Sequence, residues 1–197
     1  NGSMDNHDIY RAGVVVQQTE AIQFDDGGSS TGYAMSAFAS YKQGHGQSFV
    51  GTGIIIKSAK FYIKKTSSPT GTAAAKIYAH SGTLGTSSIP TGAALATSDT
   101  IDVSTLTTSL VQTEFVFSGI NQITLTSGTS YVVTVEYSDG GDVSNYIETE
   151  KDNTSSTHGG NFSHLSGGSW TAVSGVDMRF LLTGTPFTKL EPQYLLA

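Results

Sequence analysis

The stretch QSFVGTGIIIKSAKFYIKK, residues 47–65, restricts the fold of this chain more than any other part of it. In its second half, Phe61 and Ile63 alternate with Lys60 and Tyr62. A β-strand places successive side chains on opposite faces, so a period of two is typical of a strand with one buried face and one solvated face. The alternation therefore predicts a half-buried strand.

The same pattern returns after a turn. Residues 66–73, TSSPTGTA, contain a proline and a glycine, which often interrupt regular structure. Beyond this turn, Ile77 lies between Lys76 and Tyr78. We expect two adjacent antiparallel strands with Tyr62 and Tyr78 on their polar faces, where the two rings either form a cross-strand pair or bind a ligand.

Short apolar runs separated by glycine-rich or acidic turns continue along the chain, and no helical segment is present to connect parallel strands. The expected strands are 48–56, 59–65, 74–80, 94–103, 112–117, 121–125, 130–137, 143–148, 169–173 and 177–182, with one or two more in 13–24 and another in 32–41. The expected core is Phe61, Ile63, Ile77, Phe115, Phe117, Tyr131, Val133, Val135, Phe180 and Leu182. These features predict an all-β protein, a two-sheet antiparallel β-sandwich of jelly-roll-like form.

The length of 197 residues suits a single domain, which we place at residues 13–184. Residues 1–12 are polar and aperiodic, so we expect a tag remnant followed by an N-terminal arm. The tail at 185–197 carries two prolines and several large apolar side chains. We expect this tail either to cover the domain's own sheet or to act as a linker that docks on another chain.

Charge and composition restrict the partners. The net charge is −6 and the pI is near 5.2, which argues against a nucleic-acid partner because such proteins need clustered Lys and Arg. No apolar run reaches the length of a membrane span. Cysteine is absent, which excludes disulfides, thiol catalysis and cysteine-based zinc sites. Such Thr-, Ser- and Gly-rich β proteins are frequent among exported bacterial proteins and phage particles, so we expect an extracellular or virion location.

Four segments together carry a family resemblance. They are QSFVGTGIIIKSAKFYIKKTSSPTGTAAAKIYAHSG, PTGAALATSDTIDVSTLTT, FVFSGINQITLTSGTSYVVTVEYS and GGSWTAVSGVDMRFLLTG, all within residues 47–184. This region resembles the jelly-roll-like sandwich of carbohydrate-binding modules that occur in bacterial secreted and surface proteins and in phage tail and other virion proteins. The resemblance implies a non-catalytic domain that recognises glycans.

Aromatic side chains are the candidate ligand-binding residues, because the C–H face of a sugar ring stacks on a flat aromatic surface. Trp170 is the single tryptophan and follows two glycines, so it either forms a platform on a loop or packs over the end of the sandwich. Tyr146 lies beside another glycine-rich turn, and Tyr62 and Tyr78 lie on polar strand faces. We expect the glycan to contact some of these four rings.

Acidic turns suggest a structural calcium ion. Asp25 and Asp26 precede two glycines, Asp139 and Asp142 flank two more, and Asp177 begins the final predicted strand, where the resembling modules often place a calcium ligand. Calcium takes six to eight oxygen ligands, which carboxylates and main-chain carbonyls on such turns supply. Tight Asp-Gly hairpins explain the same residues without a metal.

Motifs for catalysis are weak. The histidines have no HExxH spacing. The sequence GSSTG at residues 28–32 matches G-x-S-x-G, but a nucleophile elbow leads from a strand into a helix, and a strand is expected at 32–41. His158 and His164 flank a short polar loop, and alternation places Glu136 on a solvated sheet face beside Thr134. We therefore expect a glycan-binding module and not an enzyme. The alternative is a structural or assembly protein of a phage particle or surface assembly, with homo-oligomer or virion contacts through the arm and tail.

Overall fold

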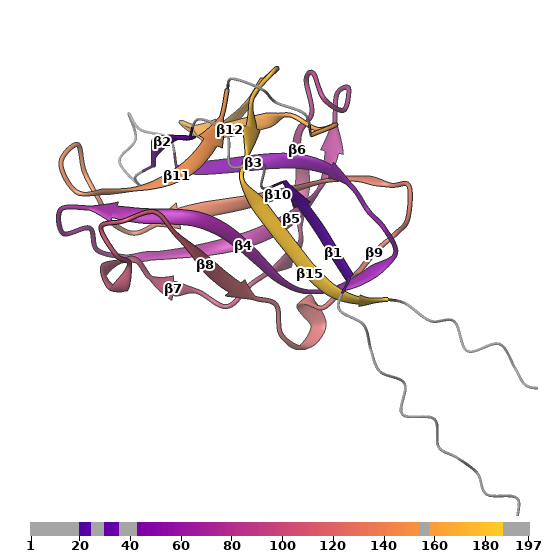
Figure 1. The fold of residues 1–197 in the computed structure, drawn as a ribbon, viewed down its shortest axis with the longest axis horizontal. Coiled ribbons are helices and arrows are strands. Elements are labelled where there is room, and N and C mark those ends of the chain that lie inside the picture. The colour runs from indigo at the N-terminus through magenta and orange to yellow at the C-terminus, as the bar shows by residue number, and fades with distance from the viewer. Residues whose placement is uncertain (1–19, 25–29, 36–42, 154–157, 187–197) are drawn as a thin grey trace, which may run out of the picture.

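The computed structural model of this chain describes residues 20–24, 30–35, 43–153 and 158–186. Within these residues the fold is all-β, with two antiparallel sheets and two short 3-10 turns, η1 (Val103–Thr105) and η2 (Gly119–Asn121). The predicted sandwich class is confirmed. The first and last described strands lie side by side (Figure 1).

Sheet A contains β1 (Glu20–Phe24), β15 (Phe180–Pro186), β4 (Ile54–Thr66), β11 (Tyr146–Asp152) and β14 (Asp177–Met178) in that order, with β2 (Ser30–Met35) beside β11, and β8 (Val111–Val116) and β9 (Thr124–Leu125) beside β4. Sheet B contains β13 (Ser169–Val173), β12 (Phe162–Ser166), β3 (Gly44–Val50), β10 (Ser130–Ser138), β5 (Thr72–Ser81) and β6 (Ile89–Thr97) in that order, with β7 (Ile101–Asp102) beside β5.

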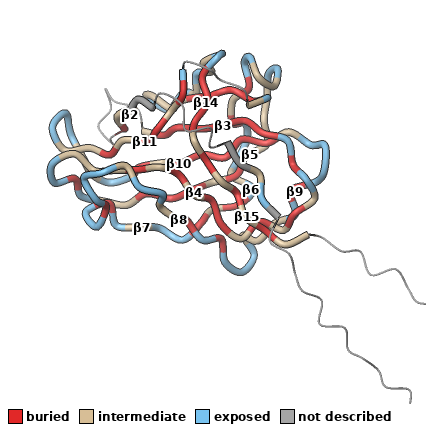
Figure 2. The backbone as a smooth tube through the Cα atoms, viewed as in Figure 1, coloured by how far each residue is buried: buried red, intermediate tan, exposed pale blue. Residues whose placement is uncertain are grey.

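The core lies between the two sheets and contains all ten residues predicted for it. On β4, Phe61 and Ile63 are fully buried, and the Phe61 ring meets the Phe115 ring edge-on at 5.8 Å between centroids. From sheet B, Val133 and Val135 of β10 point into the same core. Figure 2 shows buried segments along β3, β4 and β10 and exposed segments at the turns. Period-two patterning therefore identified the inner faces correctly.

The prediction that the strands of Tyr62 and Tyr78 are neighbours is wrong. The connection after β4 passes from sheet A to sheet B, so the two strands lie in different sheets. Both edges of β4 are already paired, with β15 and β11 on one side and β8 and β9 on the other. Ser67 and Gly71 adopt positive φ angles of 60° and 94° in the connecting turn, which allows the chain to change sheets.

Several predicted strand boundaries also differ. The expected strand 48–56 is two strands, because the chain turns at Gly51–Gly53 with Gly53 at φ 91°. The expected strand 94–103 is β6 followed by β7, the expected 121–125 begins in η2, and the expected 143–148 is displaced to β11. The last expected strand is divided at Arg179 into β14 and β15, and β15 extends to Pro186. These differences lie at turns, where alternation gives no signal.

Strand β12 was not predicted. Its sequence FSHLS places a histidine on the inner face and offers little apolar contrast between its two faces. The expected arm at 1–12 lies outside the described residues, as does the tail from residue 187 onward.

We expect Phe61→Ala to lower the free energy of unfolding by about 3–5 kcal/mol, because the ring is fully buried and its removal leaves a cavity. Val116→Ala is the matched control: Val116 lies on β8, is 46% exposed, and should change stability by no more than about 0.5 kcal/mol. Denaturant titration measures both values. A loss below about 1 kcal/mol for Phe61→Ala would contradict its place in the core.

Candidate ligand-binding face

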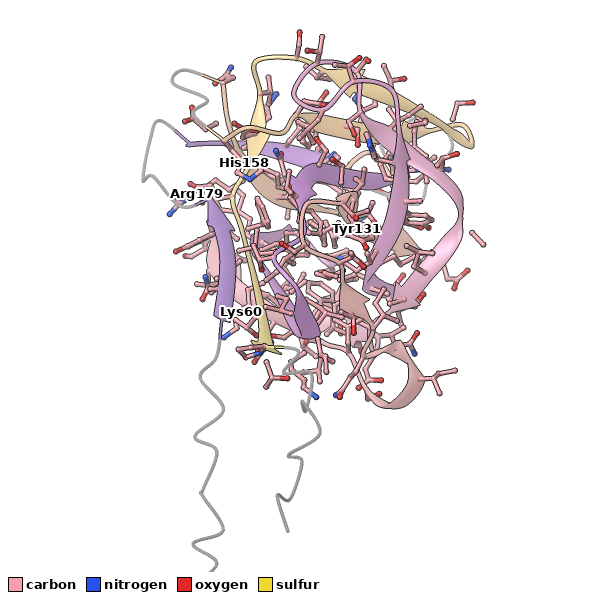
Figure 3. The ribbon with its side chains drawn as sticks, turned by 90° about the vertical axis from the view of Figure 1, so that its right-hand side faces the viewer. Lys60, Tyr131, His158 and Arg179 are labelled. Carbon is pink, nitrogen blue, oxygen red and sulfur yellow. The ribbon has the colours of Figure 1, made fainter. Side chains whose placement is uncertain are left out.

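The outer face of sheet A carries three ion pairs, two between neighbouring strands and one between β11 and Arg179, which lies between β14 and β15. They are Lys60 with Glu114 at 3.4 Å, Lys64 with Glu148 at 3.2 Å and Arg179 with Glu150 at 2.7 Å. The Arg179 guanidinium also lies 4.1 Å from the centroid of the Tyr62 ring, over its face. Tyr146 begins β11 in the same sheet and is opposite Thr66. Figure 3 shows Arg179 and Lys60 toward different ends of the molecule.

The outer face of sheet B brings together residues from four strands. Gly44 of β3 is paired with Leu165 of β12 on one side and with Glu136 of β10 on the other. Leu165 is in turn paired with Trp170 of β13. Residues in register across a sheet share one face, so these four residues form a row on the outer surface. We call it the Gly44 row.

Gly44 gives this row its shape. A Cβ atom at position 44 would lie 3.2 Å from Cη2 of Trp170, 3.0 Å from Cγ of Glu136 and 3.4 Å from Cβ of Leu165. The tryptophan ring therefore extends across Leu165 as far as β3, and the glutamate approaches the same point from β10. The missing side chain allows an aromatic ring and a carboxylate side chain to meet over the backbone of β3.

The Glu136 carboxylate is held by three donors. Its oxygens accept hydrogen bonds from Lys76 Nζ at 2.6 Å, Tyr78 Oη at 2.8 Å and Thr134 Oγ1 at 3.0 Å. Burial raises the pKa of the Tyr78 phenol strongly, and the charge of Glu136 and the hydrogen bond to it add to the rise. The phenol therefore stays protonated and donates. The negative charge of Glu136 is matched by Lys76, and the carboxylate is fixed in orientation.

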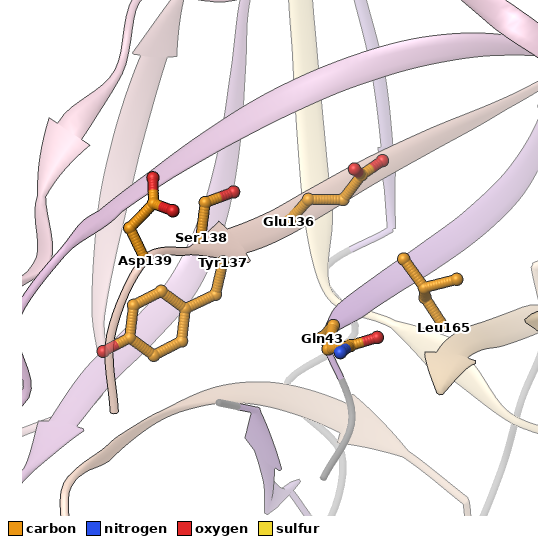
Figure 4. Close-up of a pocket in the computed structure, with 6 residues that line it drawn as sticks. All are labelled: Gln43, Glu136, Tyr137, Ser138, Asp139 and Leu165. Carbon is orange, nitrogen blue, oxygen red and sulfur yellow. The ribbon is translucent and has the colours of Figure 1, made fainter. Parts of the chain in front are cut away.

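A pocket of about 320 Å³ opens at the end of this face, where β10 ends and β3 begins. It is lined by Gln43, Glu136, Tyr137, Ser138, Asp139 and Leu165. Figure 4 shows Tyr137 leaving β10 on the opposite side from Glu136. The volume is at the lower end of the range of about 300–1,000 Å³ for small-molecule pockets. The amide, hydroxyl and carboxylate groups suit a ligand rich in hydroxyls.

The structure separates the predicted aromatic residues. Trp170 and Tyr78 lie on the outer face of sheet B, whereas Tyr62 and Tyr146 belong to sheet A. Sequence reasoning placed Glu136 correctly on the outer face of its strand beside Thr134, but that face is not solvated there: Thr134 is fully buried and the Glu136 side chain is 12% exposed. The sequence gave Glu136 no part in binding. Gly44 and Gly46 are two residues apart, so both lie on the same face of β3. Two glycines on one face leave room above a strand, and this pair was the signal that the sequence offered for a site here.

The predicted metal ligands are not brought together where the structure describes them. Asp139 and Asp142 belong to one exposed loop before β11, and the Asp142 carboxylate is bonded within that loop to Ser144 and Asn145. Asp177 is fully buried and paired with Asp152 at the far end of β11, a distance of about 20 Å along the strand.

Across the described parts of the chain, no group of three or more His, Cys, Asp or Glu side chains is arranged to hold a metal ion. Asp25 and Asp26 lie outside those parts. Calcium binding stays a prediction.

Asp177 belongs instead to a buried polar cluster between the sheets. The Gln47 amide nitrogen donates to Asp177 Oδ1 at 2.6 Å, and the Gln47 amide oxygen accepts from the backbone N–H of Met178 at 2.7 Å. His158 Nδ1 accepts from the backbone N–H of Gly160 at 3.1 Å and lies 3.2 Å from the Gln47 amide nitrogen. These bonds connect β3 with β14 and with the loop before β12.

The same cluster makes stability depend on pH. Burial lowers the pKa of His158 below its ordinary value of 6.5, and the opposing effect of Asp177, 3.9 Å away, is smaller. The His158 imidazole therefore binds a proton more readily in the unfolded chain than in the folded chain. The contribution of neutral His158 to the stability of the fold is complete above about pH 6.5 and is lost as the pH falls through the pKa of His158 in the folded chain.

We expect the melting temperature of the wild type to fall more between about pH 7 and about pH 5 than that of His158→Gln, which has no proton to bind at this site. Differential scanning calorimetry of both proteins measures the two slopes, and the carboxylates common to both cancel in the comparison. Parallel slopes would show that His158 does not titrate differently in the folded chain.

The described part of the chain contains no helix long and apolar enough to cross a membrane. No protein-family model matches the sequence, and no curated protein matches it either. The resemblance to carbohydrate-binding modules is therefore supported at the level of architecture alone, an all-β protein with two antiparallel sheets.

Proposed function

We propose that this protein is a non-catalytic module of an extracellular or virion protein that binds a glycan on the outer face of sheet B. The observation that carries this proposal is the meeting of Trp170 and Glu136 over Gly44, next to an open polar pocket. A pyranose ring presents C–H bonds on its faces and hydroxyls around its edge. An aromatic ring beside a fixed carboxylate offers partners for both.

Charge favours a neutral ligand over an ionic one. Glu136 is compensated by Lys76 at 2.6 Å, so the face presents hydrogen-bonding groups without a net local charge from this pair. The whole chain carries −6, which disfavours polyanions such as nucleic acids. A neutral saccharide fits both conditions.

Two variants test the site against a matched control. Trp170→Ala removes the aromatic surface, and Glu136→Gln keeps the shape of the side chain but removes its charge. Tyr146→Ala is the control, because Tyr146 is a partly buried aromatic residue like Trp170 but lies on the other sheet. A glycan array selects the saccharide, and isothermal titration calorimetry with that saccharide measures affinity.

We expect Trp170→Ala to weaken binding by at least about tenfold, since aromatic anchors dominate such contacts, and Glu136→Gln to weaken it measurably. Tyr146→Ala should bind as the wild type does. Circular dichroism confirms that each variant is folded. Loss of affinity in Tyr146→Ala alone would move the site to sheet A, and no saccharide binding by the wild type would reject the proposal.

The alternative is a structural protein of a phage particle or surface assembly, and the edge of sheet A favours it. Among the described residues β8 is paired as a strand with β4 only. The Val116 carbonyl at its end accepts the backbone N–H of Asp99, and the rest of its outer edge is open to another strand. Val116 and Ile120 nearby are 46% and 96% exposed. Size-exclusion chromatography with light scattering distinguishes the two: a stable oligomer supports assembly, and a monomer supports the glycan-binding module.

A further inference from the structure

We infer that the candidate site receives the end of a saccharide chain and not an internal stretch of it. This inference rests on the proposed glycan-binding function and specifies which part of the glycan is recognised. It follows from the outer face of sheet B, which is covered at one end of its strands and open at the other.

The covered end is built by the segment between β5 and β6. Ser88, just before β6, donates its backbone N–H to Asn161 Oδ1 at 3.1 Å and accepts from Asn161 Nδ2 at 3.0 Å through its carbonyl. Asn161 immediately precedes β12. Strands β10 and β3 lie between β5 and β12 in the sheet, so these two bonds span the face.

Further bonds fix this cover in place. Ser48 of β3 accepts the backbone N–H of Asn161 through its hydroxyl at 2.8 Å, and His80 Nδ1 lies 3.0 Å from the Ser88 hydroxyl. Ser48, Ser88 and Asn161 are all fully buried. A saccharide chain therefore has no path out of the face at this end.

Burial decreases along the strands toward the other end. On the outward side of β10, Val132 and Thr134 are fully buried, the Glu136 side chain is 12% exposed, and Ser138 is exposed. Antiparallel to it, β3 begins at the open end, where Gln43 lines the pocket. The pocket therefore lies at the less buried end of these strands, where Gln43, Ser138 and Asp139 contribute to its lining (Figure 4).

The row behind Gly44 is closed by Ser163. Ser163 of β12 lies one row deeper than Leu165, and its Oγ is 2.8 Å from the position that a Cβ of Gly46 would occupy. This hydroxyl is fully buried and has no hydrogen-bond partner among the described residues. Its complete burial shows that the row behind Gly44 is filled by protein atoms and does not admit a ligand.

The geometry gives each part of the ligand a place. The terminal ring lies against Trp170 with its hydroxyls toward Glu136, and the rest of the chain leaves over the exposed loop of Ser138 and Asp139. An internal sugar carries a glycosidic bond on both sides. The covered rows behind Gly44 leave no room for the second of these bonds.

The test compares the number of protein-binding sites on one polysaccharide before and after its chains are shortened. The probe is the soluble neutral polysaccharide selected by the glycan array, used intact and after limited hydrolysis that increases chain ends without changing sugar composition. Calorimetric titration of wild-type protein gives binding sites per unit mass of polymer for both samples. Trp170→Ala is titrated in parallel as the site control.

We expect the number of sites per unit mass to rise in proportion to the number of chain ends. An unchanged number, with binding still sensitive to Trp170→Ala, would overturn chain-end recognition and leave the proposed function intact. Absence of binding to the intact and the hydrolysed sample alike would overturn both proposals.

Discussion

Strand β10 is the element on which both the core and the candidate site depend. It is paired along its whole length, with β3 on one side and β5 on the other. Its inward residues Val133 and Val135 are packed in the core, so the strand cannot slip by one residue without moving Glu136 to the apolar inner face and these valines out of the core. Hydrophobic burial inside the sandwich thus fixes the position of a carboxylate on its outside.

The neighbouring strand β3 is fixed by polar contacts instead. Its inward Gln47 is fully buried and bridges Asp177 and the backbone of Met178, while Ser48 on the outward side holds Asn161. Buried polar groups that are fully bonded select one arrangement, because any shift leaves several of them unsatisfied. These bonds keep Gly44 in register with Glu136 and Leu165, and so keep the space over β3 open.

The two outer faces use their charges differently. On sheet A, Glu114, Glu148 and Glu150 are each paired with a base, and Arg179 also covers the ring of Tyr62. On sheet B the pair of Lys76 and Glu136 is accompanied by Tyr78 and lies beside a pocket. Acidic and basic side chains therefore form ion pairs with one another on sheet A. On sheet B the corresponding pair lies beside a space that a ligand can fill.

The sequence by itself determined the fold class and the inner face of most strands, because a period of two in apolar residues has one structural meaning. It placed Phe61 in the core and Glu136 outside. Which strands are neighbours was decided only by the tertiary structure. Tyr62 and Tyr78 are close in sequence but lie on different sheets, while Trp170 and Glu136 approach the same point over Gly44 although their strands are separated by two others. Alternation of apolar and polar residues shows which face of a strand a side chain lies on, but it carries no information on which distant strands are paired. The candidate site is formed by that pairing, so only the tertiary structure could show it.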